Sequence, residues 1–316
     1  MLFFTLRARV LSALVLLASV SVAHAQSATT PDERCATVRM DSLLHAKHPH
    51  LPNQTQFEAW MAEQRAARQV ASTNDESYPL VRIPVIVHVV HDGEPVGTGP
   101  NISAEQVYSQ IEVLNEDFRR LPGTPGFNDN PVGADAFIEF VPATIDTNGL
   151  LLDEPGIRRY DGGRFNWSTD DIDGELKPAT FWNPSQYFNF WTLRFAPGPF
   201  GTLLGYAQFP IMSGLDGLSQ PGFDTTAATD GIVMGYEYFG SRDKGDFPDL
   251  DPVNGYGRTT THEAGHYFGL RHIWGDGGCG IDDFCEDTPE SDASNRGCPT
   301  SHTSCGSVDM VENYMD

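Results

Sequence analysis

The sequence predicts an α+β fold in which a small N-terminal segment precedes one larger domain. Three observations support this prediction. A dense run of β-branched residues at 81–90 predicts a buried strand. Apolar residues recur at helical spacing over 104–119. Shorter apolar runs follow, separated by Gly- and Pro-rich loops, with no internal repeat.

The first 25 residues predict a secretory signal peptide. Arg7 and Arg9 form a basic start, residues 10–22 form a short apolar run, and the Ala-His-Ala sequence at 23–25 is a small-x-small cleavage signal. The alternative is a transmembrane anchor, which usually needs about 20 apolar residues. We therefore expect a secreted, extracellular protein with no membrane attachment after signal cleavage, in which disulfides can form.

Residues 26–80 differ in character from the rest of the chain. They are polar, with one predicted helix at 57–69 and a linker at 71–77 whose composition favours exposure and cleavage. A new domain is expected to begin at 81–90, because this stretch is dense in β-branched residues and ends at a His-Asp-Gly turn, the pattern of a core strand followed by a turn.

The elements of this second domain follow from local patterns. Ser103 followed by Gln106 is a capping-box signature for the helix at 104–119, whose apolar face should pack on the sheet. Further strands are predicted at 136–141, 188–195, 203–209 and 231–233.

The charge and composition exclude several classes of function. The chain has 20 Lys and Arg against 43 Asp and Glu, a formal net charge of −23. Such acidity argues against binding to nucleic acid or to anionic membranes. With 40% hydrophobic residues, the chain has enough apolar material for a sizeable core, which argues against wholesale disorder.

A histidine motif near the C-terminal end carries the chemistry. Residues 262–272 read HEAGHYFGLRH. On a helix, His262 and His266 lie four residues apart, so both imidazoles can reach one zinc ion. Glu263 lies about 100° around the helix, where a carboxylate can touch a metal-bound water without becoming a ligand.

The motif extends beyond the helix. Gly269 can end the helix in a left-handed turn, after which His272 can return to the metal as a third nitrogen. Three histidines leave one zinc position open for water, as a catalytic site requires. A bare H-E-x-x-H can arise by chance on a surface helix, but the added Gly and His make the pattern far more specific. Met315 occupies the position of a methionine turn beneath such a site; without the histidine motif it would count as ordinary core.

These motifs resemble those of the pappalysin family of metzincin zinc metalloproteases, in particular its small microbial members. The resemblance covers most of residues 81–316. It is carried by IPVIVHVVH at 83–91, QIEVLNEDF at 110–118, LLGYAQFP at 203–210, HEAGHYFGLRHIWGD at 262–276, DDFCEDTP at 282–289 and NYMD at 313–316.

The resemblance implies a metzincin-type catalytic domain at 81–316, with a twisted mixed sheet, backing and active-site helices, and two subdomains around a cleft. It implies zinc bound by His262, His266 and His272. It also implies Glu263 as general base and then acid, and Met315 as the turn methionine. The substrate, a protein or peptide, would join a rim strand as an extra antiparallel strand. Residues 204–207 look like that rim, although a plain buried strand is equally open from the residues alone.

The family also carries calcium near the zinc helix. By position, the resemblance favours Asp283, the backbone carbonyl of Glu286, and Thr288 as its ligands, in a loop whose oxygen-rich composition suits calcium. A merely solvated acidic loop is the alternative.

The resemblance gives the cysteines separate roles. It implies a disulfide between Cys279 and Cys305, and a second between Cys298 and a cysteine just after the methionine turn. Because the chain stops before that cysteine, a family tyrosine and a final helix, we expect a truncated C-terminus. Cys285 has no counterpart that we can place.

Cys35 lies in Arg34-Cys35-Ala36-Thr37, which resembles the R-C-G-T stretch of family pro-segments, with Ala36 in place of glycine. This implies that residues 26–80 are a pro-segment and linker. A thiolate at the fourth zinc position would keep the zymogen silent until an activating protease removes this segment. An incidental odd cysteine is the alternative.

The sequence therefore predicts a secreted zinc endopeptidase, made as a zymogen, that hydrolyses peptide bonds through a zinc-bound water activated by Glu263. One alternative is a calcium-stabilised binding or adhesion protein with a vestigial metal site, which the intact Glu263 argues against. A zinc hydrolase acting on other substrates is a further alternative, which a chelator-sensitive protease assay would separate.

Overall fold

The computed structural model describes residues 34–71, 79–198, 202–210, 215, 218, 226–297 and 299–316. The signal peptide predicted at 1–25, most of the linker predicted at 71–77, and Cys298 lie outside these residues. The described residues all belong to one unit, Asp32–Asp316. Among them, no helix is long and apolar enough to cross a membrane.

A mixed sheet forms the centre of the fold, and its central strand is the run predicted at 81–90. This strand, β1 (Val81–His91), pairs in parallel with β2 (Ile138–Pro142), β3 (Ile157–Asp161) and β4 (Phe188–Leu193). Beyond β4 lie β6 (Ile232–Gly235), which is parallel, and β5 (Gly205–Ala207), which is antiparallel to β6. In the described part of the chain the order is β2-β1-β4-β6-β5, so β5 is an edge strand.

The structure confirms the predicted strands but shifts their ends. The strands predicted at 136–141, 188–195, 203–209 and 231–233 are β2, β4, β5 and β6. β3 was not predicted, because Arg158 and Arg159 interrupt its apolar pattern. The guanidinium of Arg159 binds Glu154 (Nε to Oε2, 2.6 Å), so a charged residue is accommodated within the strand.

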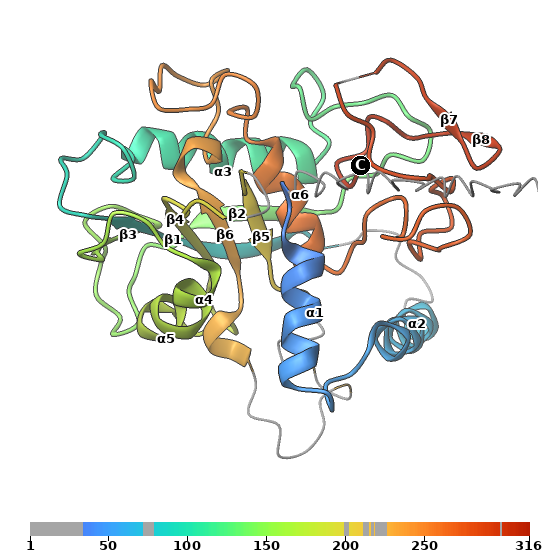
Figure 1. The fold of residues 1–316 in the computed structure, drawn as a ribbon, viewed down its shortest axis with the longest axis horizontal. Helices are drawn as coiled ribbons and strands as arrows, with labels where there is room; N and C mark the ends of the chain where they lie inside the picture. Colours follow the sequence, from blue (N-terminus) through green and yellow to red (C-terminus); the bar gives the residue numbers. More distant parts are fainter. Residues whose placement is uncertain are drawn as a thin grey trace, which may run out of the picture. The chain divides into compact units, whose positions relative to one another are not determined.

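Helices cover both faces of the sheet, which explains why β4 and most of β1 are buried on both sides. Helices α3 (Ala104–Phe118) and α6 (Arg258–Tyr267) lie over one face (Figure 1). The short helices α4 (Thr169–Asp171) and α5 (Lys177–Thr180), joined by the π-helical turn Ile172–Leu176, cover the other (Figure 1). The apolar residues predicted for α3, among them Val107, Ile111 and Leu114, are buried against the sheet.

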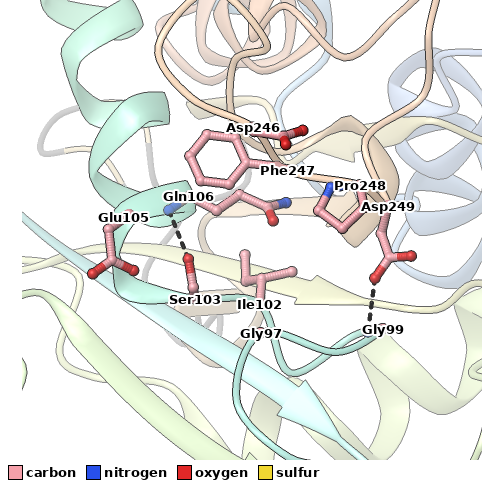
Figure 2. Close-up of a pocket in the computed structure, with 10 residues that line it drawn as sticks. All are labelled: Gly97, Gly99, Ile102, Ser103, Glu105, Gln106, Asp246, Phe247, Pro248 and Asp249. Carbon is pink, nitrogen blue, oxygen red and sulfur yellow. Dashed lines mark hydrogen bonds between the residues drawn. The ribbon is translucent and has the colours of Figure 1, made fainter.

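Of the two hydrogen bonds that make up the predicted capping box of α3, one forms. Ser103 accepts the backbone N–H of Gln106 at 3.2 Å, as Figure 2 shows. The Gln106 side chain does not return to the cap. It turns inward and donates to the carbonyls of Tyr236 and Phe239 at 3.2 and 2.8 Å, because these buried acceptors need a partner.

The polar N-terminal segment packs along the free edge of β5. It contains α1 (Thr37–Lys47), which was not predicted, and α2 (Gln54–Ala71), which confirms the helix predicted at 57–69 and extends it at both ends. Before α1, Leu204 N donates to Arg34 O at 2.9 Å and Ala36 N donates to Gly205 O at 3.2 Å. Cys35 pairs with Gly205 in parallel orientation. The segment thus supplies the strand partner that the edge of β5 otherwise lacks.

The C-terminal segment has few regular elements and is stabilised by cross-links. The disulfide predicted between Cys279 and Cys305 is present. Asp309, which is buried, accepts hydrogen bonds from His302 Nδ1 at 2.7 Å and from Ser304 Oγ at 2.7 Å. These contacts tie the short hairpin of β7 (Thr303–Ser304) and β8 (Ser307–Val308) to the segment that precedes Met315.

Asp309 should make stability depend on acid pH. Burial raises the pKa of its carboxyl, but hydrogen bonds from His302 and Ser304 outweigh burial and lower that pKa from 3.8 to about 2. The folded state therefore favours the carboxylate, so the stabilisation is present above about pH 4 and is lost as pH falls towards about 2. We expect Asp309→Asn to reduce the free energy of unfolding by about 1–2 kcal/mol at pH 6, and by less at pH 3. Denaturant unfolding at both pH values measures this, with the exposed Ser301→Ala as control. An equal loss at both pH values would contradict the assignment.

Candidate active site

The three predicted histidines converge in the structure. Helix α6 presents His262 and His266 on one face and ends at Tyr267. Gly269 then adopts a positive φ of 99°, as expected for a left-handed turn, and the chain reverses to bring in His272. The Nε2 atoms lie 3.1 Å (262 to 266), 3.2 Å (266 to 272) and 3.3 Å (272 to 262) apart.

The opposite nitrogen of each imidazole is held by an oxygen acceptor. His262 Nδ1 donates to the Tyr314 carbonyl at 2.6 Å, and His266 Nδ1 donates to the Leu270 carbonyl at 2.8 Å. His272 Nδ1 lies 2.5 Å from Asp276 Oδ1. Because these acceptors hold the proton at Nδ1, each Nε2 directs a lone pair towards the common centre.

This donor set fits zinc. Nitrogens bound tetrahedrally at about 2.0–2.1 Å from one zinc ion would lie about 3.3 Å apart, close to the separations observed. The imidazoles must also be neutral to act as ligands. Burial, followed by the neighbouring His272, lowers the pKa of His262 to about 4, and burial lowers the pKa of His266 well below its usual value.

Glu263 lies on the same helix and is fully buried. Its Oε2 accepts a hydrogen bond from Thr37 Oγ1 at 2.8 Å and lies 3.5 Å from Cys35 Sγ. Burial raises the pKa of Glu263 to about 7, against the lowering effect of these contacts. A carboxyl whose pKa lies near neutrality can both accept and release a proton at physiological pH.

Met315 is buried beside α6, the helix that carries His262 and His266. It fits closely against Gly265 of α6, where an added Cβ would come within 2.3 Å of Met315 Sδ. The backbone carbonyl of Met315 accepts from Ile273 N at 3.0 Å, which ties it to the segment that carries His272. The glycine between the two helical histidines is therefore required for this close approach.

The buried carboxylate of Asp117 connects α3 to this centre. It accepts from Arg258 Nη1 at 2.9 Å, Thr261 Oγ1 at 2.6 Å and Tyr314 Oη at 2.9 Å. Since the Tyr314 carbonyl in turn holds His262, Asp117 helps to fix both the helix and the turn that position this ligand.

The pocket shown in Figure 2 lies elsewhere. It is formed at the start of α3 and in the loop 246–249, where Asp249 accepts from Gly99 N at 2.9 Å. None of the predicted site residues lines it, so it contributes nothing to the chemistry of the histidine centre.

Comparison with known proteins identifies the family. Residues 251–316 match the model of the M43 peptidase family, described as pregnancy-associated plasma protein-A. Mature mirolysin of Tannerella forsythia, solved with a cleaved peptide, is 35% identical, with a TM-score of 0.61 over 76% of this chain and 84% of that one. A promirolysin variant is 31% identical, with a TM-score of 0.64 over 89% of this chain and 86% of that one.

The chain belongs to the pappalysin family. It is a metalloprotease with the metzincin fold that the resemblance implied. Extracellular metalloproteases of Arthroderma otae and Arthroderma gypseum are 27% and 30% identical to this pappalysin. The alignments cover 82% and 75% of this chain, and 78% and 65% of those proteins. Their extracellular location agrees with the location predicted from the sequence.

In this pappalysin, Cys35 lies at the histidine centre. Its Sγ and one ring nitrogen of each of the three histidines all lie within 4.8 Å of one another. Thr37, two residues later, donates to Glu263 and accepts from Ala207 N at 2.8 Å. The motif 34–37 thus contacts the candidate ligands, the candidate base and the rim strand together. Thr37 was missed from sequence, although it belongs to the stretch that pointed to Cys35.

In the loop predicted to bind calcium, two of the three predicted ligand residues interact, because the Thr288 side chain forms a hydrogen bond with the Asp283 carboxyl. Asp283 is buried, and its Oδ1 accepts the backbone N–H of Cys285 at 2.9 Å. Two groups in the described part of the chain gather three or more His, Cys, Asp or Glu ligand atoms, namely the Cys35 centre and Asp292, His302 and Asp309. Neither group includes Asp283 or Glu286. Cys285 is a free thiol.

Proposed function

We propose that this metalloprotease is a zinc-dependent endopeptidase, secreted as a zymogen, that hydrolyses peptide bonds in protein or peptide substrates. The observation that carries the proposal is the convergence of three imidazole Nε2 atoms within 3.3 Å of one another, with the Glu263 carboxylate 3.5 Å from Cys35 Sγ at the same centre. His262, His266 and His272 would hold zinc, and Met315 would form the turn beneath them.

Zinc and the protein residues have separate roles in the proposed reaction. When bound, zinc polarises the peptide carbonyl and makes water more acidic. Glu263 accepts the proton of the attacking water and later delivers it to the departing amine. β5 offers backbone groups that can align a substrate as an added strand. Asp276 and the Tyr314 carbonyl keep the imidazoles oriented throughout.

The domain assignment is part of this proposal. Residues 1–25 are the signal peptide, 26–80 the pro-segment and linker, and 81–316 the catalytic domain. The contacts of Cys35 and Thr37 support this division, because they occupy the positions that metal chemistry and proton transfer require. An activating protease would cut the linker at 71–77 and release the segment.

We also propose, from the family resemblance, that calcium binds the loop at 282–288 through Asp283, the Glu286 carbonyl and Thr288. The hydrogen bond between Thr288 and the Asp283 carboxyl supports this part of the proposal, because it brings two of the three oxygen ligands together. A rise in melting temperature on adding calcium, but not magnesium, would support this part of the proposal, and no rise would contradict it.

Metal removal tests the proposed function directly. After activation and purification, the enzyme should cleave casein, lose this activity in 1,10-phenanthroline, and recover it when zinc is restored in stoichiometric amount. Activity that survives removal of all bound metal, as measured by elemental analysis, would contradict zinc dependence. Cleavage of esters or of non-peptide amides, without cleavage of peptides, would contradict the proposal that the substrates are proteins or peptides.

A further inference from the structure

Arg271 directly precedes the candidate ligand His272, and the pro-segment covers its guanidinium. Its side chain is 13% exposed. Nη2 donates to Gln54 Oε1 of α2, and the carboxylates of Asp41 and Glu58, also in the pro-segment, act on the guanidinium electrostatically. A permanent cation of the catalytic domain is therefore neutralised by groups that leave with the pro-segment.

One catalytic-domain carboxylate stays near Arg271. Asp276 Oδ2 lies 3.8 Å from Arg271 Nη1, but Asp276 Oδ1 already binds His272 Nδ1 at 2.5 Å. Arg271 Nε has no hydrogen-bond acceptor among the described residues. Guanidinium donors thus remain available for a further acceptor once Gln54 has gone.

An apolar surface adjoins this cation. The Phe209 ring lies 5.0 Å from the guanidinium carbon of Arg271 and packs against Leu51 and Phe57 of the pro-segment. Gly269 faces the same segment, since an added Cβ would lie 3.0 Å from Phe57 Cζ. Arg271, Phe209 and Gly269 together form a surface that the pro-segment fills with its own side chains.

Strand direction shows which part of a substrate would meet this surface. The pro-segment pairs with β5 in parallel orientation at Cys35. A substrate that joins β5 in antiparallel orientation runs the opposite way, so its N-terminal residues extend past Ala207. Phe209 follows Ala207 in the chain and contacts Arg271. This surface therefore faces substrate residues on the N-terminal side of the scissile bond.

We propose that Arg271 and Phe209, once released from the pro-segment, form a subsite that favours an acidic substrate side chain on the N-terminal side of the scissile bond. This inference rests on the proposed endopeptidase function. The guanidinium supplies planar paired donors for a carboxylate, and Phe209 supports the aliphatic part of a Glu side chain. In the zymogen, Gln54, Asp41 and Glu58 interact with the Arg271 guanidinium in place of that substrate side chain.

Matched peptides test the subsite. The full-length chain is purified, activated by proteolysis in the linker, and given peptides that differ only in carrying Glu, Gln or Lys at each of four positions before the cleaved bond. For wild type, kcat/KM should be about tenfold higher with Glu than with Lys at one of these positions. Arg271→Lys should keep the preference, and Arg271→Glu should invert it. Arg82→Glu, which makes the same charge change at a side chain 68% exposed on β1, should leave it unchanged.

Each ratio is taken within one variant, so partial misfolding cancels. Binding supplies a second readout: the activated Glu263→Gln variant should bind the Glu peptide more tightly than the Lys peptide, and the double variant with Arg271→Glu should not. If wild type cleaves peptides but Arg271→Glu leaves the Glu-to-Lys ratio unchanged, the subsite is wrong and the endopeptidase proposal stands. If metal-loaded wild type cleaves no peptide at all, both fail.

Discussion

Replacing Glu263 by Gln should lower kcat/KM of the activated enzyme about 10³-fold, because the amide cannot accept a proton from water or return one to the leaving amine. The substitution keeps the size of the side chain, and the three Nε2 atoms that would hold zinc are untouched. Zinc content should therefore remain at one ion per chain. Peptide cleavage and elemental analysis on the same preparation measure the two effects separately.

A matched control for this substitution is Glu112→Gln on α3, where the carboxylate is 59% exposed and pairs with Lys244. It removes the same charge and should leave cleavage unchanged. If the Glu263→Gln enzyme retained zinc and cleaved peptides within about threefold of wild type, Glu263 would not be the proton-transfer group.

Replacing Cys35 by Ala should activate the intact chain before any cleavage. The thiol lies within 4.8 Å of all three candidate zinc ligands, and its loss would open the fourth metal position. We expect peptidase activity of the uncleaved chain to rise about 100-fold over uncleaved wild type. It should stay below that of the activated enzyme, because Thr37 still binds Glu263 and α2 still covers Arg271.

Cys285→Ala is the matched control, since Cys285 is also a free thiol but belongs to the loop after the disulfide-bonded Cys279. The uncleaved Cys285→Ala chain should have no more peptidase activity than uncleaved wild type. A Cys35→Ala chain as inactive as wild type until its linker is cut would show that backbone pairing and helix packing alone maintain latency.

The site was predictable where its geometry is local. Four-residue spacing on a helix places His262 and His266 together, and the glycine turn three residues later returns the chain for His272. The groups that orient these rings were not predicted. The Tyr314 carbonyl accepts from His262, which lies 52 positions earlier in the sequence. Because every residue has a backbone carbonyl, the side-chain pattern does not indicate which one will be the acceptor. Asp276 stands four residues after His272, but outside a helix that spacing carries no directional meaning.

The fold was predictable where burial is strong. The apolar runs that became β1, β4 and β6 are buried on both faces, and their patterns do not depend on distant partners. β3 and α1 escaped prediction because each is only partly buried and depends on tertiary contacts, β3 on pairing with β1 and α1 on the adjoining strand β5. Arg271 was overlooked for the same reason, since its partners Gln54 and Phe209 are distant in sequence.

X-ray absorption at the zinc edge, on the full-length chain before and after activation, tests the central claim most directly. The intact chain should show three nitrogen neighbours at about 2.0–2.1 Å and one sulfur at about 2.3 Å. Removal of the pro-segment, or Cys35→Ala, should eliminate the sulfur and leave the nitrogens. A chain that binds no stoichiometric zinc, or whose zinc lacks the three histidine nitrogens, would contradict the account.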